Sequence, residues 1–305
     1  MSKKKIILGP SSFSEVNKEP LNLLLKSGFE LISNPYKRKI TAEELKQMIS
    51  DDVIGIIAGL EPLNESTLDQ SKIKVISRVG SGISNLDIEF LDKKKIKYFS
   101  TPNGPINSVA ELTVGSIISL LRHTHVMNNN LHNKKWERII GTELGGKNIA
   151  IFGYGRIGKR VAEILQFLNA NIYIIDPNIN EVDANMKLVY KDEAISKADI
   201  ITIHTSGEDQ ILDENDFNNI KKGTYLCNPS RGNSVSEKGL IEAIKSNKII
   251  GAWIDTFDEE PYSGKLINFM QVILSPHIGS YTSECRYNME LHAVNNMLNC
   301  LKDGI

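Results

Sequence analysis

The sequence predicts an α/β fold built from two doubly wound parallel-sheet domains. Short apolar segments of strand length alternate with amphipathic helical segments, and this alternation runs in two blocks, residues 5–99 and 148–276. Parallel strands need a long crossover connection, usually a helix, and the alternation supplies one. A glycine-rich turn that opens a helix directly after the strand expected at 148–152 is a third sign of this fold.

The first block predicts a domain of about 100 residues. Thr41 and Glu44 form a capping-box pattern before a helix that runs through Ile49, and residues 63–70 predict another short helix. Ligands of such sheets bind beyond the carboxyl ends of the strands. The strands are expected at residues 5–8, 29–32, 53–58, 73–77 and 96–99, and the loops at their carboxyl ends include 9–11, 59–60, 79–82 and 101–104.

The second block follows two helical segments at residues 106–133. A helix is expected at 237–245, and a last amphipathic helix at 284–301. The pattern of this last helix leaves open which domain it packs against. The strands of the block are expected at 148–152, 172–175, 200–204, 224–228, 249–254 and 272–274.

The stretch that begins at Asn148 predicts a strand, a glycine turn, a helix and a second strand. Gly153, Gly155 and Gly158 occupy the glycine positions of G-x-G-x-x-G. The first glycine permits the tight turn, the second lets the backbone approach a pyrophosphate, and the third lets the helix lie close to the strand. A pyrophosphate is then expected on the unpaired N–H groups of the helix that begins at Arg156.

Asp176 ends the second strand, 18 residues after Gly158. A carboxylate at this place accepts hydrogen bonds from the ribose hydroxyls of NAD and repels the additional phosphate of NADP. Residues 177–180 contain no Arg or Lys that would hold that phosphate. The sequence therefore predicts NAD as the cofactor, against the alternative of a glycine turn that binds nothing.

Composition narrows the class of protein. A net charge of −1 gives no electrostatic reason to expect nucleic acid or a membrane as partner. The lysines at 3–5 precede too short an apolar run for a signal peptide, and no segment approaches the ~18 apolar residues of a membrane span. Three cysteines without a C-x-x-C pattern indicate a reducing, cytoplasmic compartment. No metal site is expected, because His123 and His125 lack a second pair of ligands.

Three polar segments follow strands of the second block, at residues 227–232, 255–261 and 275–280. Hydride transfer at a carbinol carbon needs an anchor for a carboxylate, a proton donor or acceptor, and a group that sets the pKa of that donor. Arg231 offers the planar fork, His277 titrates near working pH, and the carboxylate of Glu260 favours its protonated form.

Structural roles are the alternatives to these assignments. Arg231 is also able to pair with a surface acid, and His277 to be a buried structural histidine. Asp258 and Glu259 compete with Glu260, which is favoured by its place before a proline. Further residues are expected to serve packing alone: His204, Trp136 and Trp253.

The motifs resemble those of the D-isomer-specific 2-hydroxyacid dehydrogenases, especially the phosphoglycerate dehydrogenases, over nearly the whole chain. The segments that carry the resemblance are SRVGSGISNLD, TPNGPINSVAELT, KWERIIGTELGGK, GYGRIG, NPSRG, DTFDEEP and SPHIGS. The resemblance implies a flavodoxin-like substrate domain, residues 1–100 plus 284–305, and a Rossmann NAD-binding domain, residues 101–283, with a cleft between them. It also implies a homodimer that forms through residues near 100–145.

The resemblance places the catalytic arginine, glutamate and histidine on Arg231, Glu260 and His277. Arg231 is also expected to bind the substrate, together with a loop of the first domain. The substrate-binding loop falls on Val79, Gly80, Ser81 and Gly82. Cofactor contacts fall on Ser81, Arg156, Ile157, Asp176, Thr205, Ser206, Pro229, Ser230, Asp255 and Gly279, in addition to the glycines of the turn.

The expected activity is NAD-dependent, reversible oxidation of a D-2-hydroxy acid, with 3-phosphoglycerate as first substrate and glyoxylate, hydroxypyruvate or another 2-keto acid as the alternative. Residues 58–61 lack the basic residue that phosphoglycerate dehydrogenases often bring to the phosphate, although Lys37, Arg38 or Arg78 can replace it. The end of the sequence at Ile305 predicts no serine-responsive regulatory domain. Rival functions are an NAD(H)-sensing corepressor-like protein and a formate-dehydrogenase-like enzyme, which the Glu260–His277 pair disfavours.

Overall fold

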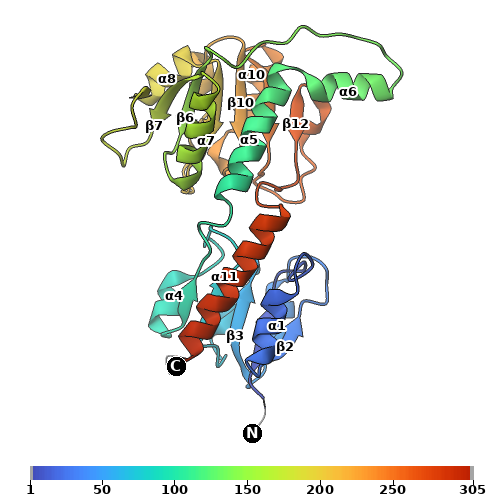
Figure 1. The fold of residues 1–305 in the computed structure, drawn as a ribbon, viewed down its shortest axis with the longest axis vertical. Coiled ribbons are helices and arrows are strands. Elements are labelled where there is room, and N and C mark those ends of the chain that lie inside the picture. Colours follow the sequence, from blue (N-terminus) through green and yellow to red (C-terminus); the bar gives the residue numbers. More distant parts are fainter. Residues whose placement is uncertain (1–2, 303–305) are drawn as a thin grey trace. The chain divides into compact units, whose positions relative to one another are not determined.

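The chain folds into two compact units, which a computed structural model describes over residues 3–302 (Figure 1). The first unit combines Met1–Pro105 with Ser280–Ile305, and the second is Ile106–Gly279. The outermost bounds expected for the first domain, at residues 1 and 305, lie outside the described residues. Both units contain parallel sheets with helices between the strands, which confirms the predicted fold class.

The first unit has a five-stranded parallel sheet in the order β2-β1-β3-β4-β5. Its centre, β3, is buried along its whole length, as expected of a strand covered on both faces. Thr41 and Glu44 make the expected capping box at the start of α2. The elements are β1 (Lys5–Leu8), α1 (Glu19–Lys26), β2 (Glu30–Ser33), α2 (Ala42–Met48), β3 (Val53–Ala58), α3 (Glu65–Leu68), β4 (Val75–Arg78), α4 (Ile88–Lys93) and β5 (Lys97–Phe99).

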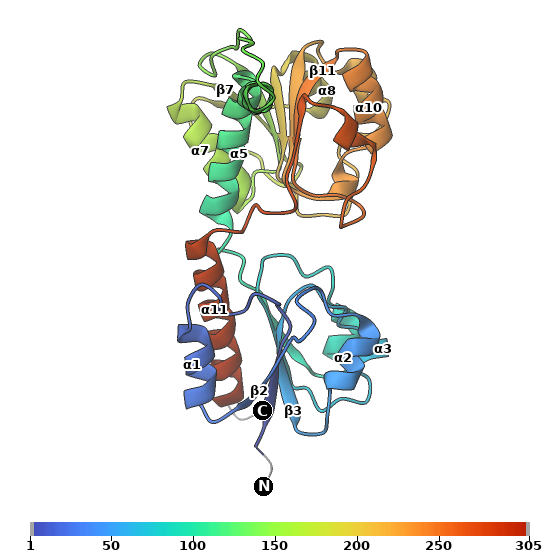
Figure 2. The ribbon, with the colours of Figure 1, turned by 90° about the vertical axis from the view of Figure 1, so that its right-hand side faces the viewer.

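The last helix, α11 (Ser283–Lys302), completes the first unit. It lies beside α1 and packs on β4 and β3 (Figure 2), with Met289, Val294 and Met297 almost fully buried. Glu290, also buried, accepts the N–H of Ser14 at 2.8 Å and a hydrogen bond from Arg286 at 2.7 Å. These contacts decide the question that the amphipathic pattern left open.

The second unit has a seven-stranded parallel sheet in the order β12-β11-β10-β9-β6-β7-β8. The sequence pattern missed β8, a three-residue edge strand of which only Met186 is buried, because so short an element has no apolar run. The elements are α5 (Ile106–Leu121), α6 (Thr124–His132), β6 (Asn148–Phe152), α7 (Arg156–Phe167), β7 (Asn171–Ile175), β8 (Met186–Leu188), α8 (Lys191–Lys197), β9 (Ile200–Ile203), α9 (Asp216–Asn219), β10 (Thr224–Asn228), α10 (Glu237–Lys245), β11 (Ile249–Ile254) and β12 (Val272–Leu274).

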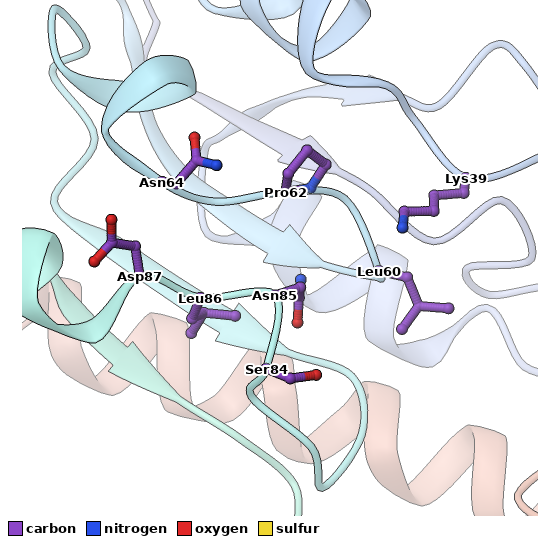
Figure 3. Close-up of a pocket in the computed structure, with 8 residues that line it drawn as sticks. All are labelled: Lys39, Leu60, Pro62, Asn64, Ser84, Asn85, Leu86 and Asp87. Carbon is purple, nitrogen blue, oxygen red and sulfur yellow. The ribbon is translucent and has the colours of Figure 1, made fainter. Parts of the chain in front are cut away.

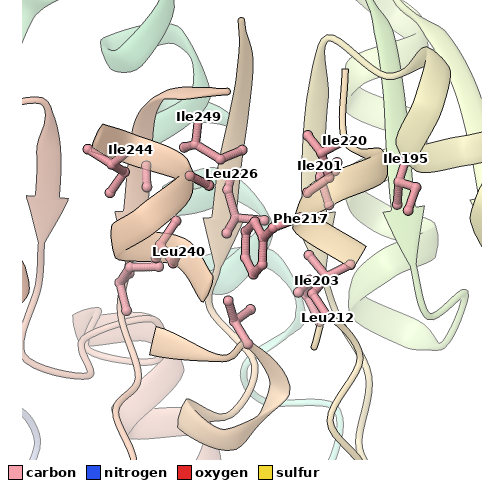
Figure 4. Packing of buried hydrophobic residues seen from close by; sticks show 14 of the residues in the cluster. Ile195, Ile201, Ile203, Leu212, Phe217, Ile220, Leu226, Leu240, Ile244 and Ile249 are labelled. Carbon is pink, nitrogen blue, oxygen red and sulfur yellow. The ribbon is translucent and has the colours of Figure 1, made fainter. Parts of the chain in front are cut away.

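Alternate residues of these strands face two separate apolar clusters, one on each side of the sheet. Leu226 packs with Phe217 and Leu240 under α9 and α10 (Figure 4), whereas its neighbour Cys227 belongs to the cluster under α5 and α7. Trp253 is on the α5 and α7 side. The two-residue period of a strand produces this division and aligns the carboxyl ends of the strands along one edge.

The strand order sorts the loops at that edge into two groups. β10, β11 and β12 are consecutive neighbours, so the segments after them lie side by side. β6 has β7 on one side and β9 on the other, which makes it the point where the strand order reverses and where such sheets bind ligands. No helix of the described residues is long and apolar enough to cross a membrane.

Candidate active site

Glu260 and His277 are in direct contact. The two carboxylate oxygens of Glu260 lie 3.1 and 3.0 Å from Nδ1 of His277. Oε1 of Glu260 also accepts the N–H of Phe257 at 3.1 Å, which fixes the carboxylate to its own loop after β11. Because Nδ1 faces a carboxylate, the other ring nitrogen, Nε2, remains available for proton exchange.

The hydrogen bond that Nδ1 of His277 donates to the carboxylate of Glu260 raises the pKa of His277, and the negative charge of Asp255 acts in the same direction. Burial and the positive charge of Arg231 act against this rise. The pKa of His277 therefore lies above its ordinary value, and the imidazolium persists to higher pH than in a free histidine.

Arg231 lies in the segment after β10, next to the loop that carries Glu260. A Cβ atom at Gly232 would lie 2.1 Å from the backbone N of Asp258, so the two segments pass in direct contact. The guanidinium donates to the carbonyl of Ser230 at 2.8 Å, and Asn228 donates to the carbonyl of Arg231 at 2.7 Å. Its charge acts on His277, as expected of groups that share one site.

The glycine turn after β6 has the shape that a pyrophosphate requires. Gly153 has φ +89°, and a Cβ there would meet the carbonyl of His204 at 2.7 Å. A Cβ at Gly158 would lie 1.9 Å from the carbonyl oxygen of Gly153, so the helix touches the turn. A Cβ at Gly155 would project into open space, and no side chain of the described residues caps the start of α7. The backbone N–H groups there are consequently open to an anion.

Asp176, the acid at the end of β7, is held by backbone N–H groups. One carboxylate oxygen accepts from Tyr154 at 2.8 Å and the other from Asn178 at 2.9 Å. The carboxylate is thereby fixed beside the glycine turn, and each oxygen keeps a lone pair for a ribose hydroxyl. Arg156 and Ile157 open α7 on the other side of the same turn.

The remaining expected cofactor contacts of the second unit lie after β9, β10, β11 and β12. Ser230, which follows Pro229, donates its hydroxyl to the carbonyl of Thr205 at 2.7 Å, and this bond ties the loop of Thr205 and Ser206 to the loop of Arg231. Asp255 is 1% exposed, and its Oδ2 accepts the N–H of Gly279 at 2.9 Å. In the structure Asp255 therefore holds the histidine loop.

The expected substrate loop belongs to the first unit and follows β4. Gly80 donates to the hydroxyl of Thr101 at 2.8 Å and accepts the N–H of Thr101 at 2.9 Å. Arg78 donates to the carbonyl of Val79. Among the described residues, the N–H groups of Ser81 and Gly82 have no acceptor, so these two are open to a carboxylate. The sequence placed Thr101 in a loop at a strand end but did not indicate its contact with Gly80, because nothing local marks a contact across 21 residues.

A hollow of about 570 Å³ lies beside this loop (Figure 3). Lys39, a residue that the sequence analysis did not select, lines it, and the amide of Asn85 ties its two walls by donating to the carbonyls of Glu61 at 2.7 Å and Gly59 at 3.4 Å. The other residues that line it are Leu60, Pro62, Asn64, Ser84, Leu86 and Asp87.

A doubly wound sheet with this glycine turn and acid defines a dinucleotide-binding protein. The family model for the NAD binding domain of the D-isomer specific 2-hydroxyacid dehydrogenases matches residues 114–279. The chain therefore belongs to the D-isomer specific 2-hydroxyacid dehydrogenase family, with NAD as its cofactor. This result confirms the resemblance that the sequence motifs indicated.

Similar proteins include two relatives of different length. The D-3-phosphoglycerate dehydrogenase of Pongo abelii is 34% identical over 87% of this chain and 51% of its own length, so the chain spans about half of that relative. The hydroxypyruvate reductase of Thermotoga maritima is 28% identical over 88% of this chain and 93% of its own. A crystal structure of a protein from Thermus thermophilus has the same fold, with a TM-score of 0.90, 22% identity and coverage of 98% and 97% of the two chains.

From the Glu260–His277 contact we predict that removal of the Glu260 carboxylate shifts the pH–rate profile of keto-acid reduction. In Glu260→Gln the pKa of His277 falls toward its ordinary value, because the carboxylate that raises it is gone. With His277 as the predicted proton donor, reduction of a keto acid requires its imidazolium, so the alkaline limb of the pH–rate profile is expected to move to lower pH. Steady-state rates across pH check this, with Glu259→Gln as the control. An unmoved limb contradicts the assignment.

The carboxylate of Asp176 predicts a change in cofactor preference. Asp176→Ala removes the charge that repels the phosphate of NADP, so the preference for NADH over NADPH is expected to fall by roughly tenfold or more. Fluorescence titration of both reduced cofactors measures it. The control is Glu181→Gln, which removes an exposed carboxylate from the same connection. Equal loss of preference in both variants would assign the effect to overall charge instead.

Proposed function

We propose that the protein is an NAD-dependent dehydrogenase of D-2-hydroxy acids. The observation that carries the proposal is the placement of Arg231, Glu260 and His277 in the segments after three neighbouring strands, in the same unit as the dinucleotide turn. An anchor for a carboxylate, an acid–base group and its carboxylate partner are what transfer of hydride and proton at a carbinol requires.

Each residue has a separate task in the proposed reaction. Arg231 binds the substrate carboxylate and polarises the C2 oxygen. His277 takes the hydroxyl proton in oxidation and returns it in reduction, while Glu260 orients the ring. Bound NAD supplies the acceptor or donor of the hydride at C2.

Removal of the carboxylate anchor tests the enzymatic proposal against a sensing role. In Arg231→Ala, kcat/KM for reduction of 2-keto acids is expected to fall by at least ~100-fold, since a charged two-point contact is lost. The Kd of NADH is expected to stay within about threefold of the wild-type value. Arg231→Lys keeps the charge without the fork and should recover only part of the rate. A wild-type protein that turns over every keto acid below about 0.01 per second overturns the proposal.

The choice of substrate depends on a second anionic group. The resemblance favours 3-phosphoglycerate, but two of the basic residues proposed to hold its phosphate are engaged. Arg38 forms a two-point contact with Glu44 at 2.6 and 2.9 Å, and Arg78 is 9% exposed against the backbone of its own loop. Glu61 lies in the segment 58–61, where a basic residue for the phosphate is missing. Its buried carboxylate accepts the N–H of Gly59, at 2.9 and 3.0 Å. These contacts support the alternative substrate class, 2-keto acids without phosphate.

A matched pair of substrates decides between the two classes. We expect hydroxypyruvate to be reduced with a higher kcat/KM than 3-phosphohydroxypyruvate, which differs from it by the phosphate alone. The hollow of Figure 3 contains one basic side chain, Lys39, which makes Lys39→Met the test of the opposite outcome. If the phosphorylated acid is preferred, 3-phosphoglycerate is the substrate, and loss of that preference in Lys39→Met or in Lys37→Met identifies the lysine that binds its phosphate.

We also propose that the chain forms a homodimer through the region of residues 100–145. Within it, Leu131 is 57% exposed, Trp136 81% and Ile140 95%, a concentration of apolar surface that is unusual for a monomer. Ile140→Asp is expected to shift the sedimentation coefficient from dimer to monomer. Phe167→Asp, at an 86% exposed position on α7, is the control. A monomeric wild type contradicts the proposal.

A further inference from the structure

A line of partly buried hydrogen bonds runs from the core of the second unit to the histidine loop. The indole Nε1 of Trp253 donates to the hydroxyl of Ser275 at 2.8 Å, and that hydroxyl donates to Oδ1 of Asp255 at 2.5 Å. The same oxygen accepts the N–H of Ile278 at 3.0 Å, and Oδ2 accepts the N–H of Gly279 at 2.9 Å. One buried carboxylate therefore joins a core tryptophan to the two residues that follow the histidine.

The conformation of His277 depends on such support. Its φ is +53°, in the left-handed region that a residue with a Cβ adopts at a cost, and its own N–H donates to the carbonyl of Ser275 at 2.9 Å. The side chain is 46% exposed, so core packing does not hold the ring. The backbone on both sides of His277 is held, through Ser275 before it and through Ile278 and Gly279 after it.

The two inner members of the line are placed to stiffen Asp255. Trp253 is 0% exposed and packs in the cluster under α5 and α7, so its indole is a fixed donor. Ser275 follows β12 directly, and its hydroxyl links the indole to the carboxylate of Asp255, which is 1% exposed. A buried carboxylate with three donors has one orientation, and the loop that it holds inherits that orientation.

We propose that Ser275 and Trp253 are positioning residues that act through Asp255 to hold the imidazole of His277 against Glu260. Neither touches a reacting atom. The inference deepens the proposed dehydrogenase function, on which its catalytic consequence rests. Without the serine hydroxyl the loop relaxes, and the ring spends less time within hydrogen-bonding distance of Glu260. The charged groups that face His277 are Glu260, Asp255 and Arg231, and none of them is removed by a change at Ser275 or Trp253.

The test compares Ser275→Ala, Ser275→Thr and Trp253→Phe in the full chain. In Ser275→Ala the pKa of His277, followed by NMR of its ring protons in the absence of substrate, is expected to move down, and the alkaline limb of keto-acid reduction to move with it. We expect kcat to fall about fivefold or more while the KM of NADH stays near the wild-type value. Ser275→Thr restores the hydroxyl and should behave as wild type, and Trp253→Phe should give a smaller shift in the same direction.

The control is Ser234→Ala, at a buried serine whose hydroxyl has no partner among the described residues. A merely structural role lowers the melting temperature of Ser275→Ala but leaves the pKa of His277 in the folded protein unchanged, and that result overturns the inference. Equal shifts in Ser275→Ala and Ser275→Thr also overturn it. If the NMR shift appears but the wild type reduces no 2-keto acid, the positioning role stands and the proposed function fails.

Discussion

The functional assignments depend on the parallel arrangement of the strands in both sheets. A parallel strand must be followed by a crossover, so each carboxyl end opens into a loop at the same edge. Polar side chains gather there without entering the apolar layers on the two faces. In the second unit this edge holds the segments after β10, β11 and β12 in consecutive order, which brings Arg231 beside the loop of Glu260 and Glu260 beside His277. Residues that are remote in the chain become neighbours because their strands are.

In both units, loops at the carboxyl ends of the strands are shaped by carboxylates that accept backbone N–H groups. Asp176 accepts the backbone N–H groups of residues 154 and 178, and Asp255 accepts those of residues 278 and 279. Glu61 accepts the backbone N–H of Gly59. A carboxylate is suited to this task because it accepts several hydrogen bonds and has no hydrogen of its own to satisfy. Burial raises the pKa of Glu61, and the backbone hydrogen bonds that it accepts and the charge of Arg78 oppose that rise. These acidic residues of both units therefore fix the conformation of their loops in addition to carrying charge.

Sequence patterns predicted the elements whose signals are local. The glycine turn, the capping box at Thr41 and the strand at 249–254 are each written within a few neighbouring residues, and the structure has all three. The edge strand β8 carried no such signal, and the packing partner of the last helix is a property of tertiary structure. The catalytic roles of Arg231, Glu260 and His277 stay predictions, to which the structure adds their proximity.

The contacts that the sequence did not disclose join distant residues. Trp253 was expected to serve packing alone, since no pattern announces that its indole meets a serine 22 residues later. Arg38 was a candidate for binding a phosphate, and its engagement by Glu44 depends on the turn between β2 and α2. A sequence shows the charge and type of each residue, whereas the hydrogen-bond or ion-pair partner of a side chain is known only from the three-dimensional structure.

The return of α11 to the first unit makes that unit discontinuous in the chain, whereas the second unit is one uninterrupted segment. During synthesis from the N-terminus, the sheet of the first unit emerges early but lacks the helix that buries part of it. Met289, Val294 and Met297 reach it only after the whole second unit has left the ribosome. The later-made unit is therefore the first that can complete its apolar core, and the face of β3 and β4 that α11 covers stays exposed until then.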